Sequence, residues 1–399
     1  MKIVTLSTYP IDTPFHGGQH RLRNIVDCYR AAGHNVRSLG VLGSSEYAKS
    51  DGFLPHPGAN EFTRFIADPF LMEDFAIGRM AVGDDRLFSE LAAQFDGDPP
   101  DAIHIEQPWL FPFALRYCSE QSGGRSKLIY GSQNVEHELK RRIVKAFANE
   151  KRADDCARMV LDLEMSALQL ADMICCVSEG DAEWTKQHAR CSVVVGANGV
   201  RDRVTTHTGL AQANRITGHR KHALYCASGH PPNISGFFEI FGRGVGCFSP
   251  DERIVVAGGA AGVIRGDARF PKTPGLASHY VPAGTVTDEC LQGLLTTAHV
   301  VVLPVTEGGG TNLKSAEAIW SGCHVVATPT AMRGFEGFMA ARGLSVCSTP
   351  LEFRRKVLAA MARPPLVLTE DEIAARRVVL WEQTLKPLVD QLSEFENRV

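Results

Sequence analysis

Short apolar segments alternate with longer segments of helical periodicity along most of the chain, and this alternation restricts the fold more than any other feature of the sequence. In the first half of the chain, the segments predicted to form strands are residues 2–6, 35–41, 102–106, 127–130, 173–177 and 192–195. Helical patterns lie between them, notably over residues 20–32 and 135–171. Strands that alternate with helices indicate a parallel sheet with helices on both faces.

The same alternation then starts again. Further strands are expected at residues 222–227, 253–257, 299–304 and 324–327, and helices at 233–241, 287–297, 311–321, 351–362 and 371–393. Residues 198–218 are polar and contain glycine, which is typical of a linker. We therefore expect an α/β protein with two doubly wound, Rossmann-like domains, residues 1–200 and 201–375, followed by a C-terminal helix at 376–399.

Composition excludes several classes of protein. The 399 residues suggest two domains at ~150 residues each, and 42 Lys and Arg against 45 Asp and Glu give a net charge of −3, which argues against nucleic-acid binding. The eleven cysteines show no CxxC motif and no zinc-type spacing, so we interpret them as free thiols in a reducing compartment. No apolar segment reaches the ~20 residues of a membrane-spanning helix. We expect a cytoplasmic protein, and contact with a membrane surface stays open.

A first glycine-rich loop lies between the first predicted strand and the first predicted helix. Gly17 and Gly18 would allow the backbone to approach a ligand closely, and the helix that follows would offer free N–H groups to an anion. A plain tight turn is the alternative. The loop lacks the GxGxxG pattern of dinucleotide-binding proteins.

A second glycine-rich loop gives the strongest signal for a binding site. Three glycines, residues 308–310, separate a predicted strand from a predicted helix, and Thr311 or Asn312 is expected to cap that helix. Lys314 lies in the first turn, where a cation opposes the helix dipole unless an anion binds nearby. Glu317 could accept hydrogen bonds from two ribose hydroxyls. The alternative is a capped helix with a local Lys–Glu pair.

Together and in this order, the motifs resemble those of the retaining glycosyltransferases of the GT-B fold, of the family-four (glycosyl transferases group 1) type, in a subgroup with a GGTNLK donor loop. The resemblance covers nearly the whole chain. It rests on Gly17-Gly18, Gly33-His34-Asn35-Val36, Ala171-Asp172 with Val177-Ser178-Glu179, Asn198-Gly199-Val200, Ser228-Gly229-His230-Pro231-Pro232-Asn233, and Gly309-Gly310-Thr311-Asn312-Leu313-Lys314 with Glu317-Ala318.

The resemblance implies a fold and a reaction. The two domains would face each other across a cleft, with the last helix crossing back to the first domain. The enzyme would transfer a sugar from a UDP- or GDP-linked nucleotide-diphosphate sugar to a hydroxyl of a glycan, a lipid-linked acceptor or a small molecule, with retention of configuration. Since the sequence shows no acidic cluster, we expect neither a metal nor a cofactor.

The resemblance also implies roles for single residues. The residues expected to bind the donor are Gly17, Gly18, His230, Asn233, Gly309, Gly310, Thr311, Asn312, Leu313 and Glu317. Those expected at the reaction centre are Lys314, Asn134 and Glu136, and those on the acceptor side are Arg21, Glu106, Gln107 and His137. Two alternatives stay open: Asn134 and Glu136 could cap a helix, and Arg21 could be a solvated helix charge.

Two departures from the family pattern concern the donor site. The family has two glutamates eight residues apart; Glu317 matches the second, but Gly309 stands at the position of the first. The usual basic pair that binds the diphosphate is also missing, so Lys314 is the main candidate for that charge. A nucleotide-sugar 2-epimerase of the same fold and a nucleotide-sugar-binding protein without catalysis therefore remain alternatives. An NAD-dependent enzyme is disfavoured, because residues 256–262 lack the required glycine spacing.

Overall fold

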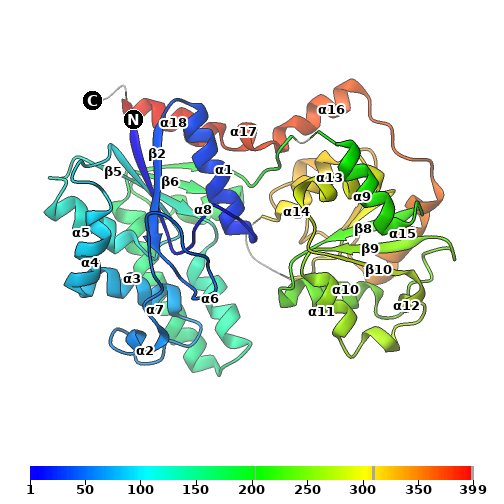
Figure 1. Cartoon of the computed structure of the whole chain (residues 1–399), viewed down its shortest axis with the longest axis horizontal. Coiled ribbons are helices and arrows are strands. Elements are labelled where there is room, and N and C mark those ends of the chain that lie inside the picture. The colour runs from blue at the N-terminus through cyan, green and yellow to red at the C-terminus, as the bar shows by residue number, and fades with distance from the viewer. Residues whose placement is uncertain (203, 308–310, 397–399) are drawn as a thin grey trace. The chain divides into compact units, whose positions relative to one another are not determined.

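The computed structural model describes residues 1–202, 204–307 and 311–396. The chain divides into two units: one comprises Met1–Ala197 and the segment from Thr384 onward, which contains the last helix, α18 (Lys386–Glu396), and the other comprises Asn198–Gln383 (Figure 1). Each unit is built around one parallel sheet, as predicted. All eleven cysteines are free, and each is buried or half-buried.

The first unit contains a seven-stranded sheet in the order β3-β2-β1-β4-β5-β6-β7. Its strands are β1 (Lys2–Ser7), β2 (Asn35–Val41), β3 (Phe53–Leu54), β4 (Ala102–Glu106), β5 (Lys127–Ser132), β6 (Met173–Cys176) and β7 (Ser192–Val195). Six of these were predicted; β3, with 2 residues, is too short to show a period.

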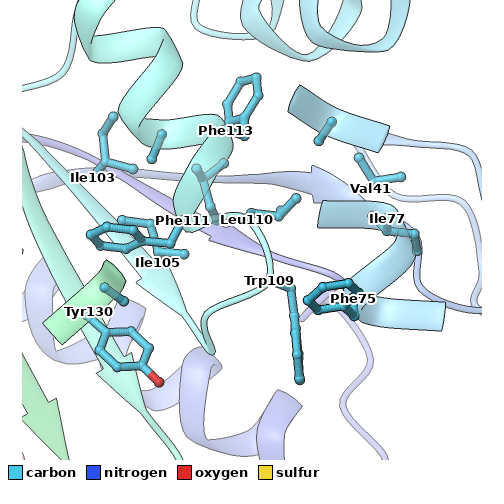
Figure 2. Close-up of a cluster of buried hydrophobic side chains, with 14 of the residues drawn as sticks. Val41, Phe75, Ile77, Ile103, Ile105, Trp109, Leu110, Phe111, Phe113 and Tyr130 are labelled. Atoms are coloured by element: carbon cyan, nitrogen blue, oxygen red, sulfur yellow. The ribbon is translucent and has the colours of Figure 1, made fainter. Parts of the chain in front are cut away.

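The helices of the first unit connect the strands and complete its core. They are α1 (Gly17–Ala31), α2 (Ala59–Phe62), α3 (Glu73–Gly83), α4 (Asp85–Ala93), α5 (Phe111–Glu120), α6 (Glu136–Lys145), α7 (Glu150–Leu170), α8 (Glu179–Lys186) and α18. Figure 2 shows part of the core, where Ile103 and Ile105 from one face of β4 gather with Phe111 and Phe113 of α5.

The second unit contains a six-stranded sheet in the order β10-β9-β8-β11-β12-β13. Its strands are β8 (His222–Cys226), β9 (Arg253–Ala257), β10 (Tyr280–Gly284), β11 (Val300–Leu303), β12 (His324–Ala327) and β13 (Leu344–Val346). Its helices are α9 (His207–Thr217), α10 (Pro231–Phe241), α11 (Ala260–Gly266), α12 (Leu276–His279), α13 (Asp288–Thr297), α14 (Leu313–Trp320), α15 (Pro350–Ala362), α16 (Glu370–Arg376) and, at the unit's end, α17 (Trp381–Thr384).

Two predicted segments differ in the structure. The predicted linker contains helix α9, which packs so closely on α13 that a Cβ atom at Gly293 would lie 2.2 Å from the carbonyl oxygen of Gly209. The predicted helix at 371–393 is interrupted, because Leu380 forms an isolated parallel bridge with Val200. The backbone groups used in that bridge are not available to a helix.

In both sheets the strand order reverses beside the first strand. β1 lies between β2 and β4, and β8 lies between β9 and β11. In doubly wound sheets, ligands bind beyond the carboxyl ends of the strands at such a reversal. The segments that follow β1 and β4 in one unit, and β8 and β11 in the other, are therefore the expected places of a binding site.

Candidate functional site

The second unit brings together the loop after β8 and the start of α14, which flank its strand-order reversal. The loop leads into α10, whose first turn contains proline, a residue suited to the first turn of a helix. Gly309 and Gly310, predicted to bind the donor, lie outside the described residues. The predicted residues that the structure does describe here are His230, Asn233, Thr311, Asn312, Leu313, Lys314 and Glu317.

Lys314 connects the two segments. Its Nζ donates a hydrogen bond to Oδ1 of Asn233 over 2.5 Å, and Nδ2 of Asn233 donates to the carbonyl oxygen and the Oγ of Ser228 over 3.1 and 3.2 Å. The hydroxyl of Tyr225 donates to the backbone oxygen of Asn233, and the Lys314 ammonium lies 6.0 Å from the centre of the Tyr225 ring. Because Asn233 is buried, the position of the ammonium is well defined.

Burial lowers the pKa of Lys314 to about 8, although Cys226 and Glu317 favour the charged form. At neutral pH the ammonium is therefore protonated but poorly solvated, a state that a bound anion would stabilise. Partial desolvation and the charge of Lys314 lower the pKa of His230, so this imidazole is neutral at the same pH. Glu317 lies one turn farther along α14 and is half-buried. The charge of Lys314 thus interacts with both His230 and Glu317.

The start of α14 differs from the prediction that Thr311 or Asn312 caps it. Asn312 is the N-cap residue, but its side chain makes no capping hydrogen bond. The amide that a cap would bind, that of Ser315, donates instead to the backbone oxygen of Asn312 over 3.0 Å. Within the described parts of the chain, Thr311 Oγ1 and Asn312 Nδ2 are buried without a hydrogen-bond partner. Leu313, the first residue of the helix, is half-buried.

In the first unit, Arg21 and Glu106 form a buried ion pair. Each is 1% exposed, and Nε of Arg21 lies 3.1 Å from Oε1 of Glu106. Arg21 also donates to the carbonyl oxygen of Gly196 over 2.6 Å, and Glu106 Oε2 shares a 2.8 Å hydrogen bond with Nε2 of His104. The alternative of a solvated charge at Arg21 is therefore wrong. Because both partners are buried, we interpret the pair as a structural element that positions neighbouring residues such as Gln133.

Gln133 binds this ion pair and connects it to the first glycine-rich loop. Its Nε2 donates to Glu106 Oε1 over 2.9 Å and to the Tyr9 hydroxyl over 2.6 Å. A Cβ atom at Gly18 would lie 3.1 Å from the Tyr9 hydroxyl, so this position has little room for a side chain. Gly17 is the first residue of α1 and is exposed. Tyr9 was not among the predicted site residues.

His16 and Gln19 form a capping box at the start of α1. Burial lowers the pKa of His16 to about 4, which keeps its ring neutral so that Nδ1 can accept from the Gln19 amide. By the general geometry of a helix start, the amides of Gly17 and Gly18 remain as donors. Both alternatives for this loop, a tight turn and an anion site, are compatible with this arrangement.

Asn134, Glu136 and Gln107 come together beyond the carboxyl ends of β4 and β5. Nδ2 of Asn134 and Nε2 of Gln107 donate to the same oxygen, Oε1 of Glu136, over 3.2 and 3.3 Å. Gln107 adopts a φ of 63°, which is uncommon for a residue with a side chain. Burial raises the pKa of Glu136 to about 7, and the nearby Glu164 acts in the same direction. Glu136 can therefore hold or release a proton near neutral pH.

Glu164, which sequence reasoning missed, caps α6. Its carboxylate accepts hydrogen bonds from the backbone amides of Glu136 over 2.6 Å and His137 over 2.9 Å, and it lies 2.7 Å from Nδ1 of His137. The alternative that Asn134 or Glu136 caps this helix is therefore wrong. A signal existed in the sequence, because Glu164 stands four residues before the buried Leu168, on the apolar stripe of its helix.

Among the described residues, none of the helices has the length and apolar character that crossing a bilayer requires. Over the same residues, no group of three or more His, Cys, Asp or Glu side chains could bind a metal ion.

Comparison with known proteins gives matches at the level of structure. No family model and no curated protein matches the sequence. Sucrose-phosphate synthase from Thermosynechococcus elongatus aligns over 100% of both chains, with 14% identity and a TM-score of 0.71. HepE from Anabaena, in complex with UDP and glucose, aligns over 100% of both chains, with 14% identity and a TM-score of 0.61. WaaG, a glycosyltransferase involved in lipopolysaccharide biosynthesis, aligns over 98% of this chain and 95% of its own, with 13% identity and a TM-score of 0.61.

At these identities the matches show the fold. Two Rossmann-like units in one chain, each with a strand-order reversal beside its first strand, form the fold of the GT-B glycosyltransferases. The predicted α/β fold with two Rossmann-like domains is thus confirmed.

Proposed function

We propose that this protein is a retaining glycosyltransferase, which moves a sugar from a nucleotide-diphosphate sugar to an acceptor hydroxyl. The observation that carries the proposal is the desolvated ammonium of Lys314, which Asn233 holds in the first turn of α14. A cation there opposes the helix dipole, and desolvation destabilises it further. Binding of a diphosphate at the same place would offset both costs.

In this proposal the second unit binds the donor. Lys314 and the amides at the start of α14 bind the diphosphate, and His230 supplies a neutral hydrogen-bonding group. Glu317 accepts hydrogen bonds from the ribose hydroxyls. Lys314 replaces the family's basic pair and stabilises the negative charge that develops on the leaving diphosphate, so no metal is required for that task. The complexes of HepE with UDP and with UDP-glucose support a nucleotide sugar as the donor.

The first unit contributes the acceptor side. Glu136, with a pKa of about 7, is suited to bind an acceptor hydroxyl through hydrogen bonds, and Asn134 and Gln107 orient its carboxyl group. His137 lies beside it on α6. We propose a glycan, a lipid-linked molecule or a small molecule as the acceptor. Retention of configuration follows from the family resemblance, in which the leaving phosphate takes the proton of the acceptor.

The test begins with binding. The melting temperature is measured with UDP, GDP and their sugar derivatives; a ligand at 100-fold its Kd stabilises the native state by ~2.7 kcal/mol. Lys314→Ala should lose this shift. Lys272→Ala, which changes an exposed lysine of the same unit, should keep it.

The second step measures turnover with the nucleotide sugar that binds. Release of nucleoside diphosphate with acceptors is followed, and NMR gives the anomeric configuration of the product. Transfer with retention supports the proposal. Formation of a C2 epimer without an acceptor would identify the epimerase instead, and tight binding without turnover would identify a binding protein.

A further inference from the structure

The second unit has a pocket beside the amino ends of β8 and β11, at the opposite end of these strands from the candidate donor site. The pocket has a volume of about 460 Å³, within the range of sites for small molecules. Its lining comes from the ends of α9, α13 and α15 and from the first residues of β8. β8 has 5 residues, so at about 3.3 Å per residue the pocket lies roughly 16 Å from the strand's carboxyl end and the donor site.

The charged side chains that line the pocket are all positive. Arg220, Lys221 and Arg363 line the pocket together with three histidines, and no carboxylate is among the lining residues. Lys221 is already engaged, because its Nζ donates to the carbonyl oxygen of Met361 and lies 3.9 Å from Glu252. The guanidinium groups of Arg220 and Arg363 have no hydrogen-bond or ion-pair partner in the described parts of the chain.

Part of this positive charge is explained by the helix ends nearby. α9, α13 and α15 end beside the pocket, and the carboxyl end of a helix carries roughly half a negative charge, which favours cations next to it. At α15, Lys221 binds the oxygen of Met361, and Nε2 of His299 lies 3.2 and 3.0 Å from the carbonyl oxygens of Ala360 and Arg363. The carbonyl groups at the end of α15 thus already have side-chain partners in Lys221 and His299. The guanidinium groups of Arg220 and Arg363 line the pocket and do not bind these carbonyl groups.

A further observation concerns the backbone of the lining. His222 is buried, and its ring interacts with the backbone at Arg220 and Leu294, so it serves the fold. His219 adopts a φ of 59° directly after Gly218, which has a φ of 60°. Two successive left-handed residues are uncommon, and the second carries a side chain that this conformation disfavours. Strained residues of this kind cluster at binding sites.

We propose that this pocket binds a small molecule through a phosphate group, with Arg220 and Arg363 as the groups that hold it. Arginine presents a planar set of donors that matches two phosphate oxygens at once. Since the pocket and the donor site lie at opposite ends of β8, the bound molecule does not react. Its site is therefore separate from that of the proposed transfer reaction.

The test is isothermal titration calorimetry with three probes: inorganic phosphate, glucose 6-phosphate and, as an uncharged control, glucose. The wild-type protein should bind the phosphorylated probes and not glucose. Arg220→Gln with Arg363→Gln should weaken binding by about 100-fold, because each arginine contributes charge-assisted hydrogen bonds worth about tenfold or more in Kd. Arg243→Gln, at an exposed arginine of the same unit, should leave the Kd unchanged.

The donor site is controlled for with Lys314→Ala, which should bind the probes as the wild type does. Tighter binding of glucose 6-phosphate than of phosphate would identify a phosphorylated metabolite, and equal binding would identify phosphate itself. The proposal is overturned if neither phosphorylated probe binds, or if Lys314→Ala abolishes binding. It is also overturned if the double variant melts earlier but binds normally, since the arginines would then serve only the helix ends.

Discussion

Two ionisable residues that are shielded from solvent, the half-buried Lys314 and the buried Glu136, have pKa values shifted toward neutrality from opposite sides. The pKa of Lys314 falls to about 8 and that of Glu136 rises to about 7, in both cases mainly because burial disfavours the charged form. Such shifts are frequent at functional sites. The buried pair of Arg21 and Glu106 differs, because His104 and Arg21 outweigh the effect of burial and hold the pKa of Glu106 below its usual value.

The first prediction concerns the charge at Lys314. Lys314→Ala should fold normally, because it removes a desolvated cation, but its activity should fall at least ~100-fold, since one preorganised donor to a developing anion contributes ~2.7–4 kcal/mol. Lys314→Arg should recover only part of the activity, because a planar guanidinium does not replace a compact ammonium. Steady-state rates decide, with Lys272→Ala as the control. Near-normal turnover of Lys314→Ala would move the role to His230.

The second prediction is that nucleotide affinity falls as the pH rises through about 8, the pKa of Lys314. The ammonium is charged below its pKa and loses its charge above it, and a bound diphosphate favours the charged form. The Kd for UDP should therefore be lowest near neutral pH and rise above about pH 8, and each unit of pKa difference between free and bound protein corresponds to ~1.36 kcal/mol. Calorimetry over this range measures it. Lys314→Ala should lose the dependence; an unchanged profile in that variant contradicts the assignment.

At the scale of secondary-structure elements, α6 depends on a residue of another helix for its cap. Glu164 of α7 binds two amides at the start of α6. Glu164→Ala should lower the free energy of unfolding by ~1–3 kcal/mol, because these buried donors lose their acceptor. Glu164→Gln should lose less, since an amide oxygen still accepts. Urea denaturation measures both, with the exposed Glu183→Ala as a control. Wild-type stability in Glu164→Ala would show that water replaces the cap.

The contact between α9 and α13 gives a prediction with a matched control. Gly293→Ala would place a methyl group 2.2 Å from the backbone oxygen of Gly209, so the helices must separate. We expect a loss of ~1–3 kcal/mol in the free energy of unfolding. Gly262→Ala, in α11, meets nothing within 4 Å and should stabilise the protein by up to ~1 kcal/mol through helix propensity. Equal melting temperatures for the two variants would restore the linker interpretation of residues 198–218.

At the scale of the whole molecule, the end of the chain belongs to the unit in which the chain begins. Leu388 of α18 is 0% exposed, and α18 packs on β7. Leu388→Ala should lower the stability of the first unit by ~2–5 kcal/mol. Hydrogen exchange should then quicken in β6 and β7 and stay unchanged in β8 and β11. Leu358→Ala, at a residue 49% exposed on α15, is the control. Faster exchange confined to the second unit would refute this placement.

Elements at the edges of the second sheet were not predicted, although its central strands were. β10 contains Pro282, and proline weakens the pattern of a strand while being tolerated at an edge. β13 has only 3 residues, too few for a period to be visible. The candidate site shows the same division: His230, Asn233, Lys314 and Glu317 were predicted together, whereas Tyr9 and Glu164 were not.

Local patterns in the sequence are enough to predict the two parallel sheets, their central strands and the order of the glycine-rich motifs, because strand and helix periods are properties of neighbouring residues. Which polar groups are buried, and which partner each one binds, depends on the folded structure. Lys314 and Asn233 are 81 positions apart, and Arg21 and Glu106 are 85 positions apart. No local period encodes such pairs. Their pKa values and their separation into reactive and supporting groups follow from desolvation, which exists only once the chain has folded.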